Sequence, residues 1–231
     1  MNENRKTNEI KRLIFKILLY TFLVFVAIFV IIPFYWMVLT SLKSDIDLIA
    51  SPPKLFIPFK DLVFQNFNDA FARAPFGRNM LNTVIVAFIA TIGTLLTTIL
   101  AAFAFARLNF KGRDLLFIAM ISTMMIPGEI FVITNYSTVA RLGWLGGDEV
   151  AQTYGQALLA MTLPFMTSVF YIFFLRQNFK SIPDELYFAA KVDGTSDFKY
   201  LWRIMVPIAK PTIITITILN AMGTWNAYIW P

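Results

Sequence analysis

Five apolar stretches, each long enough to cross a bilayer, dominate this chain of 231 residues. The hydrocarbon core of a membrane is about 30 Å thick, so a crossing helix needs about 20 mostly apolar residues. Backbone groups inside lipid must be paired within the chain, which restricts spanning structures to helices and closed barrels. The sequence therefore predicts an all-α integral membrane protein. Its expected spans cover residues 13–42, 79–106, 115–136, 156–175 and 201–230.

Composition excludes several classes of function. The chain is 58% hydrophobic and contains neither Cys nor His. These absences remove disulfides, thiolate metal sites, the usual general base and the commonest metal ligand. No G-x-x-x-x-G-K-[ST] phosphate loop occurs, so the chain lacks that kind of ATP site. We therefore expect no catalytic residue, no metal and no cofactor in this chain.

Lys and Arg are concentrated in three regions, which orients the expected spans. The N-terminal segment 1–12 and residues 107–114 are rich in Lys and Arg, and six more lie in the connection 178–200 and its flanks: Arg176, Lys180, Lys191, Lys199, Arg203 and Lys210. By the positive-inside rule these regions are cytoplasmic, and residues 43–78 and 137–155 lie outside. We therefore attribute the net charge of +6 to topology and expect no nucleic-acid partner.

Helix-breaking residues interrupt two of the spans. Pro127 and Gly128 break the third span, and Pro207 and Pro211 are expected to kink the fifth. Glu129, which follows the first break, is the only acidic residue inside an expected span. An intramembrane carboxylate is a candidate functional residue. Two interpretations of Glu129 remain open: it forms part of a gate or cavity, or it only bonds to backbone groups that the broken helix leaves free.

A polar segment, SIPDELYFAAKVDGTSDF, occupies residues 181–198 between the last two spans. Ser181 and Asp184 resemble a capping box, Gly194 can end a helix, and Ser196 can cap the next one. We therefore predict a short cytoplasmic helix over about 182–194, a sharp turn and then the last span. One face of this helix, about 140° wide, has two small residues at its centre. The residues of that face are Glu185, Leu186, Ala189, Ala190 and Asp193.

This segment resembles the EAA loop of the permeases of binding-protein-dependent ABC importers. The matching residues are Ala189, Ala190, Asp193 and Gly194, followed by Pro207 in WRIMVP. Other stretches are similar to the carbohydrate-uptake branch, and to the second maltose-type permease subunit in particular. These stretches are AAFAFARLNFKGRDLLF, MIPGEIFVITNY, FFLRQNFKSIPDEL and TWNAYIWP, so the resemblance covers residues 13–231.

The resemblance implies a type I importer permease in the cytoplasmic membrane of a bacterial-type cell, with its permease domain over residues 13–231. Such a subunit moves a sugar or oligosaccharide into the cytoplasm by alternating access. The implied partners are a homologous second permease, two ATP-binding subunits and an extracellular solute-binding protein, in a lipid bilayer. The resemblance also implies a sixth span after TWNAYIWP, so we expect a chain that is truncated at its C-terminus.

The resemblance further implies that the helix over 182–194 docks into a groove of an ATPase subunit and couples ATP use to transport. Phe188 stands where the family usually has Glu just before Ala-Ala. The alternative is a helix that lies on the membrane surface, although such helices favour basic residues opposite bulky apolar ones. The implied coupling residues are Glu185, Leu186, Ala189, Ala190, Asp193 and Gly194.

Amide and aromatic side chains in or near the spans are candidates for a translocation pathway, because they suit the hydroxyls and faces of sugars. Hydrogen bonds between helices and an interfacial aromatic belt are the alternatives. The candidate set holds no cluster of Lys or Arg that would bind an anion, which favours a neutral glycoside. With Glu129, the candidates are Asn82, Asn135, Asn220, Trp225 and Asn226.

Three other classes of function compete with a sugar importer. An ion-coupled secondary transporter usually needs a relay of intramembrane titratable groups, whereas the expected spans here hold one Glu and no His. A membrane-embedded enzyme would lack the common catalytic constellations. An ABC importer for a non-sugar substrate differs only in the solute.

Overall fold

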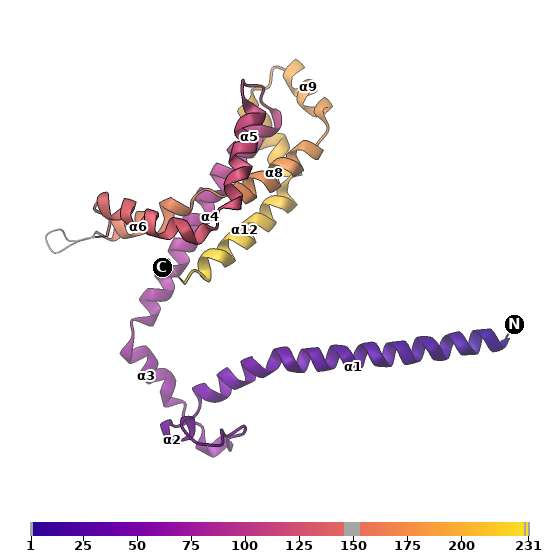
Figure 1. The fold of residues 1–231 in the computed structure, drawn as a ribbon, viewed down its shortest axis with the longest axis vertical. Coiled ribbons are helices and arrows are strands. Elements are labelled where there is room, and N and C mark those ends of the chain that lie inside the picture. Colours follow the sequence, from indigo (N-terminus) through magenta and orange to yellow (C-terminus); the bar gives the residue numbers. More distant parts are fainter. Residues whose placement is uncertain (1, 146–152, 229, 231) are drawn as a thin grey trace. The chain divides into compact units, whose positions relative to one another are not determined.

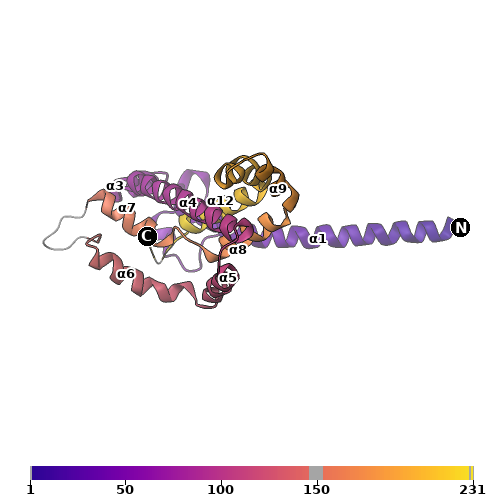
Figure 2. The same ribbon diagram turned by 90° about the horizontal axis from the view of Figure 1, so that it is seen from above.

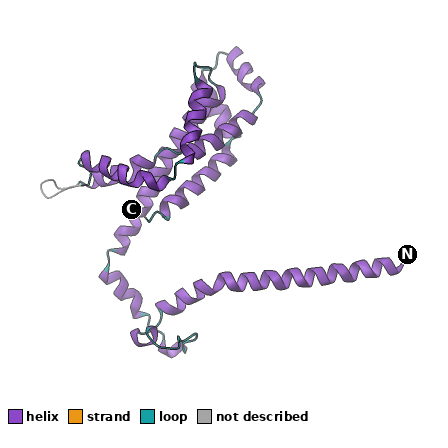
Figure 3. Cartoon of the chain, viewed as in Figure 1, coloured by secondary structure: helices purple, strands orange, loops and turns teal. Residues whose placement is uncertain are grey.

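The computed structural model describes residues 2–145, 153–228 and 230, and these form helices with no β-strand (Figure 3). The all-α prediction is therefore confirmed. Two compact units make up the chain, Met1–Gly77 and Arg78–Pro231. Helix α4 (Phe76–Arg107) begins at their boundary and belongs almost entirely to the second unit.

The first unit is built on the long helix α1 (Asn2–Ser41; Figure 1). Pro33 lies within this helix. Short elements follow it: α2 (Asp45–Leu48), a 3₁₀ turn η1 (Phe59–Asp61) and α3 (Gln65–Arg73). The amide of Asn66 donates hydrogen bonds to the carbonyls of Ser41 at 3.0 Å and Lys43 at 2.8 Å. One side chain thereby ties α3 to the end of α1.

The second unit contains the long helix α4 and a set of shorter helices, which Figures 1 and 2 show from two sides. The α-helices after α4 are α5 (Arg113–Ser122), α6 (Phe131–Arg141), α7 (Tyr154–Thr162), α8 (Val169–Ser181), α9 (Asp184–Val192), α10 (Asp197–Tyr200), α11 (Val206–Ile208) and α12 (Lys210–Trp225). Short 3₁₀ segments η2 (Thr123–Met125), η3 (Gly128–Ile130) and η4 (Leu163–Phe165) and a π-helical turn η5 (Leu201–Met205) lie between them.

Within the described residues, two continuous helices are long and apolar enough to cross a membrane, Ile10–Ser41 and Phe76–Arg107. Three further candidates are pairs of helices bent at a short break, and counting each pair as one span gives up to five. That number agrees with the five stretches expected from the sequence. The bent pairs are Arg113–Met125 with Gly128–Arg141 (84°), Tyr154–Phe165 with Val169–Ser181 (55°) and Asp197–Ile208 with Lys210–Trp225 (80°).

The breaks confirm part of the sequence prediction and add to it. The bend after Met125 falls at Pro127 and Gly128, and the bend at Ala209 lies between Pro207 and Pro211, as expected. The expected span 156–175, by contrast, is not continuous, because it bends after η4. Pro164 lies in η4, and a proline removes one backbone donor from a helix.

The main core of the second unit packs α4, α8 and the segment α9–α12 together. Alanines at several contacts allow the helices to approach closely, as is common between membrane helices. Tyr200, Phe179 and Leu175 are the largest of the fully buried side chains there. The cluster consists of Ile99, Ala102, Phe103, Leu175, Phe179, Ile182, Ala190, Tyr200, Leu201, Met205, Ala209 and Ile216.

Candidate functional site

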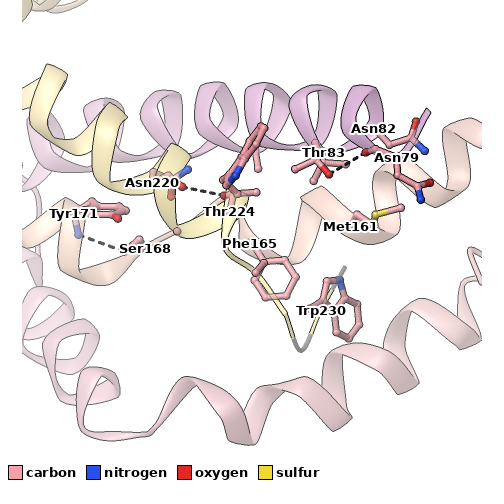
Figure 4. Close-up of a pocket in the computed structure, with 15 residues that line it drawn as sticks. Asn79, Asn82, Thr83, Met161, Phe165, Ser168, Tyr171, Asn220, Thr224 and Trp230 are labelled. Carbon is pink, nitrogen blue, oxygen red and sulfur yellow. Dashed lines mark hydrogen bonds between the residues drawn. The ribbon is translucent and has the colours of Figure 1, made fainter. Parts of the chain in front are cut away.

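A cavity of about 530 Å³ lies between α4, the break at η4, the start of α8 and the end of α12 (Figure 4). Among the described residues that line it, none is charged. Its polar lining consists of the amides and hydroxyls of Asn79, Asn82, Thr83, Ser168, Asn220 and Thr224. Its aromatic lining consists of Phe165, Tyr171, Trp225 and Trp230. The cavity therefore offers neutral hydrogen-bonding groups beside flat apolar surfaces.

Hydrogen bonds across the lining hold several of these side chains in place. The Tyr154 hydroxyl donates to Oδ1 of Asn82 at 2.9 Å, which leaves the Asn82 amide NH₂ free to act as a donor. The indole of Trp230 donates to the carbonyl of Ala160 at 3.2 Å. The Trp230 ring also meets Phe165 edge to face, with the ring centroids 5.5 Å apart (Figure 4).

The break beside the cavity is stabilised by α4. The hydroxyls of Thr94 and Thr97 donate to the carbonyls of Phe165 at 3.2 Å and Met166 at 2.6 Å. A broken helix frees backbone carbonyls, which inside a membrane need another partner. Gly93 gives the room for this approach, because a Cβ at that position would lie 2.5 Å from Sδ of Met166.

The structure brings three of the six pathway candidates to the cavity. Asn82, Asn220 and Trp225 line it. The other three are not among its lining residues: Glu129 is exposed in η3, Asn135 is partly buried in α6, and Asn226 donates to the carbonyl of Met222 at 2.9 Å.

Sequence reasoning missed several polar lining residues. Two of them had a local signal. Thr83 adjoins Asn82, and Thr224 follows Asn220 by one helical turn, so Thr224 and Asn220 lie on one face of α12. Ser168 and Trp230 carried no comparable local signal, because their place depends on the break at η4 and on the segment after α12.

Helix α9 is the short helix predicted over about 182–194, and the predicted turn follows it. Gly194 adopts a φ of +69°, and its N–H donates to the carbonyl of Lys191 at 3.0 Å. The N–H of Thr195 donates to the carbonyl of Ala190 at 2.9 Å, which completes a glycine-ended helix. Ser196 then caps α10 by accepting from the N–H of Lys199 at 3.4 Å.

The start of α9 differs from the expected capping box. Pro183 holds the cap position without a side-chain hydrogen bond. Ser181 instead belongs to α8, where its hydroxyl donates to the carbonyl of Asn178 at 2.7 Å. Asp184 pairs with the guanidinium of Arg107, the last residue of α4. Asp184 is therefore held by a partner distant in the sequence and not by a local capping box.

The face expected around Ala189 and Ala190 is divided in the structure. Ala190 is only 6% exposed and belongs to the core cluster, so its methyl group contacts the chain's own helices. Ala189 is exposed, and so are the other implied coupling residues, Glu185, Leu186, Asp193 and Gly194. Phe188 (63%) and Val192 (87%) add apolar surface to the exposed side.

Asp197 at the start of α10 fixes the orientation of α9. Its carboxylate accepts from the Tyr187 hydroxyl at 2.7 Å and pairs with the Lys191 ammonium at 2.8 Å. The hydrogen bond to Asp197 raises the pKa of Lys191. Tyr187 also packs edge to face on Tyr200, with the ring centroids 5.1 Å apart. Helix α9 is thus held by polar contacts at its surface and by an aromatic contact with Tyr200 of the core.

Comparisons with known proteins agree with this architecture. A diacetylchitobiose uptake system permease protein of Streptomyces coelicolor is 30% identical over 89% of this chain and 64% of its own length. An sn-glycerol-3-phosphate transport system permease protein of Yersinia pestis is 32% identical over 68% of this chain and 52% of its own length. A probable ABC transporter permease protein of Mycoplasma genitalium is 28% identical over 98% of this chain and 70% of its own length. The chain thus spans between about half and 70% of the length of these relatives.

The fold has a match among solved structures. A bacterial ABC transporter involved in the import of the acidic polysaccharide alginate is similar with a TM-score of 0.75 and 23% sequence identity. That match covers 94% of this chain and 72% of the other. The model of the binding-protein-dependent transport system inner membrane component matches residues 93–231. The chain therefore belongs to the family of binding-protein-dependent transport system inner membrane components, with the multi-span, type I permease fold of that family.

Proposed function

We propose that this chain is a permease subunit of an ATP-driven importer, and that it moves a neutral sugar or oligosaccharide into the cytoplasm. The observation that carries the proposal is the cavity of about 530 Å³, whose described lining residues offer amides, hydroxyls and aromatic rings but no charge. Protein sites for small molecules are often cavities with a few convergent polar groups among apolar ones.

The uncharged lining favours a neutral solute over an anion. A phosphate or carboxylate in a low-dielectric site would need a cationic partner such as Arg or Lys. The relatives' names include both kinds of solute, diacetylchitobiose and glycerol-3-phosphate. The lining of this cavity resembles what a neutral glycoside needs, because amides and hydroxyls exchange hydrogen bonds with sugar hydroxyls and indoles stack on sugar faces.

The energy for transport comes from separate subunits. An ATP-binding subunit, which supplies the ATP site, docks on the exposed side of α9 and the turn after it. This surface consists of Glu185, Leu186, Ala189, Asp193 and Gly194. Two such subunits, a homologous second permease and an extracellular solute-binding protein complete the transporter. Closure of the ATP-binding subunits moves α9 and switches the cavity between the two sides of the membrane.

The chain's N-terminus and α9 face the cytoplasm in this proposal, as the distribution of Lys and Arg suggests. A single cysteine tests this orientation cleanly because the chain has none. Val192→Cys, at an exposed position of α9, should react with a membrane-impermeant maleimide in inside-out vesicles and not in intact cells. Labelling in intact cells would show that α9 faces the outside, which is the opposite orientation.

Uptake by the complete transporter tests the substrate. Cells with the full set of subunits should accumulate a labelled neutral disaccharide or oligosaccharide, and sugar phosphates should not compete. Asn82→Ala and Asn220→Ala should lower uptake by up to about tenfold each, as expected for one lost hydrogen bond. Asn226→Ala is the matched control, since Asn226 is an amide that lies off the cavity lining. Uptake of an amino acid or oligopeptide with no sugar uptake would overturn the proposal.

A further inference from the structure

Arg107 is the last residue of α4, and it is buried, with only 8% of its surface exposed. Its guanidinium reaches the junction between α8 and α9. Nη2 donates to the carbonyls of Phe179 at 2.9 Å and Ile182 at 2.5 Å, and Nη1 pairs with the carboxylate of Asp184. One side chain of α4 therefore binds the end of α8, the connecting residues and the first residue of α9.

The chemistry at this junction suits a guanidinium. Phe179 lies in the last turn of α8, where carbonyls lack partners within the helix; its carbonyl accepts from the N–H of Ile182 at 3.3 Å and keeps a second lone pair for the guanidinium. A cation at the end of α8 and an acid at the start of α9 both complement the helix dipoles. The planar fork of Arg presents several N–H donors in fixed directions, which the compact ammonium of Lys does not.

Both helices joined at Arg107 also line the cavity. Helix α4 contributes Asn82 and Thr83 near its other end, about 35 Å from Arg107 along a continuous helix. Helix α8 contributes Tyr171 and leads directly to α9.

A second arginine joins the same two helices. Nε of Arg176, on α8, donates to the carbonyl of Phe105 on α4 at 3.1 Å. The Arg176 guanidinium also lies over the ring of Phe117, 3.6 Å from its centroid.

We propose that Arg107 is a positioning residue that makes α9 and the cavity-lining helix α4 move as one rigid body. The inference rests on the proposed role of α9 in coupling. When a partner displaces α9, the guanidinium passes that displacement to α4, because its bonds to Phe179, Ile182 and Asp184 hold the start of α9 to the end of α4. Without these bonds, the packing of Ala190 in the core still joins α9 to its neighbours, but the start of α9 can shift relative to the end of α4.

The first test measures coupling in the complete transporter, reconstituted in proteoliposomes with its ATP-binding and solute-binding subunits. Arg107→Gln should lower the amount of solute transported per ATP hydrolysed, because hydrolysis continues while the cavity wall no longer follows α9. Arg107→Lys should restore part of that ratio. Arg113→Gln is the matched control, since Arg113 is a neighbouring arginine that pairs with the exposed Asp114.

A milder variant keeps the test informative if the loss of a buried guanidinium prevents assembly. Asp184→Asn removes only the carboxylate charge, and the Asp184 side chain is 70% exposed. It should lower the transport-to-hydrolysis ratio in the same direction with normal assembly. A ratio equal to that of the unchanged transporter in both Arg107→Gln and Asp184→Asn would overturn the inference.

A distance measurement separates this inference from the proposed function. Spin labels at Leu100→Cys on α4 and Val192→Cys at the end of α9 report on the two helices, because both positions are exposed and the chain has no other Cys. We expect one narrow distance distribution, equal with and without ATP, and a broad one after Arg107→Gln. A narrow distribution in Arg107→Gln would refute the rigid connection. Absence of solute-stimulated ATP hydrolysis in the unchanged transporter would instead refute the proposed function.

Discussion

Asn220 on α12 donates a hydrogen bond from its amide to the hydroxyl of Thr91 on α4, over 3.2 Å. Thr91 is buried, whereas Asn220 also lines the cavity. The two interpretations of such an amide, a bond between helices and a contact for a solute, therefore apply to the same side chain. Because the amide keeps a second N–H and its oxygen, Asn220 can fix the cavity wall and still present polar groups to the cavity.

This contact predicts a measurable coupling between the two residues. Asn220→Ala and Thr91→Ala should each destabilise the protein by about 1 kcal/mol, with a coupling energy of about 0.6 kcal/mol in the double variant. Unfolding in mixed micelles with an increasing fraction of denaturing detergent measures the free energy of unfolding of the unchanged protein, the two single variants and the double variant. The pair Asn226→Ala and Thr91→Ala should be additive, because the Asn226 amide bonds to the carbonyl of Met222 and the Thr91 hydroxyl to Asn220. A coupling energy of zero for Asn220 and Thr91 would contradict the prediction.

The close approach of α4 to the break at η4 gives a second prediction. A Cβ at Gly93 would lie 2.5 Å from Sδ and 2.6 Å from Cγ of Met166. Alanine needs only a shift of the flexible Met166 side chain, but Gly93→Ile would overfill the site and cost about 1–3 kcal/mol. Met166→Ala should restore most of that loss in the double variant. Thermal unfolding in detergent measures the series, and equal stability of Gly93→Ile and the unchanged protein would show that α4 does not approach the break this closely.

The sequence predicted the features of this fold that depend on local chemistry. Pro127 and Gly128 break a span, and Gly194 ends a helix because its backbone takes a positive φ. Ser196 caps the helix that follows. Each of these signals lies within a few residues of its effect, so no tertiary contact is needed to interpret it.

Features that depend on residues distant in the sequence were not predictable. The carboxylate of Asp184 is paired with Arg107, and Ala190 faces the core instead of a partner. A helical face can be assigned from periodicity, but which part of it is covered depends on the neighbouring helices. The cavity illustrates the same limit, since Thr83 and Thr224 come together with Ser168 only after the span at η4 is bent.

The divided face of α9 gives a prediction that separates docking from folding. Ala189→Trp changes an exposed position, so insertion and thermal stability should stay unchanged while stimulated ATP hydrolysis is lost. Ala190→Trp should lower stability itself, because the indole must enter a closely packed core. Phe188→Glu is the surface control and should be tolerated at this exposed position. Full stimulation with Ala189→Trp would mean that the exposed side of α9 does not dock.

The turn after α9 gives the last prediction, because space and backbone conformation can be separated at Gly194. A Cβ there would meet no atom within 4 Å, so any cost of substitution comes from the φ of +69°. Asn tolerates this left-handed conformation, whereas a β-branched residue should cost at least about 1–2 kcal/mol. Pro cannot adopt it and also removes the N–H that bonds to the carbonyl of Lys191 at 3.0 Å.

We therefore expect stability and stimulated ATP hydrolysis to fall together in the order Gly194, Gly194→Asn, Gly194→Val and Gly194→Pro. Thermal unfolding in detergent and hydrolysis by the reconstituted transporter measure the two quantities on the same preparations. Gly155→Ala is the control, since Gly155 also has no atom within 4 Å of an added Cβ but lies in α7 without a positive φ. If Gly194→Val behaved like Gly155→Ala in both assays, the left-handed turn would not be what orients α9.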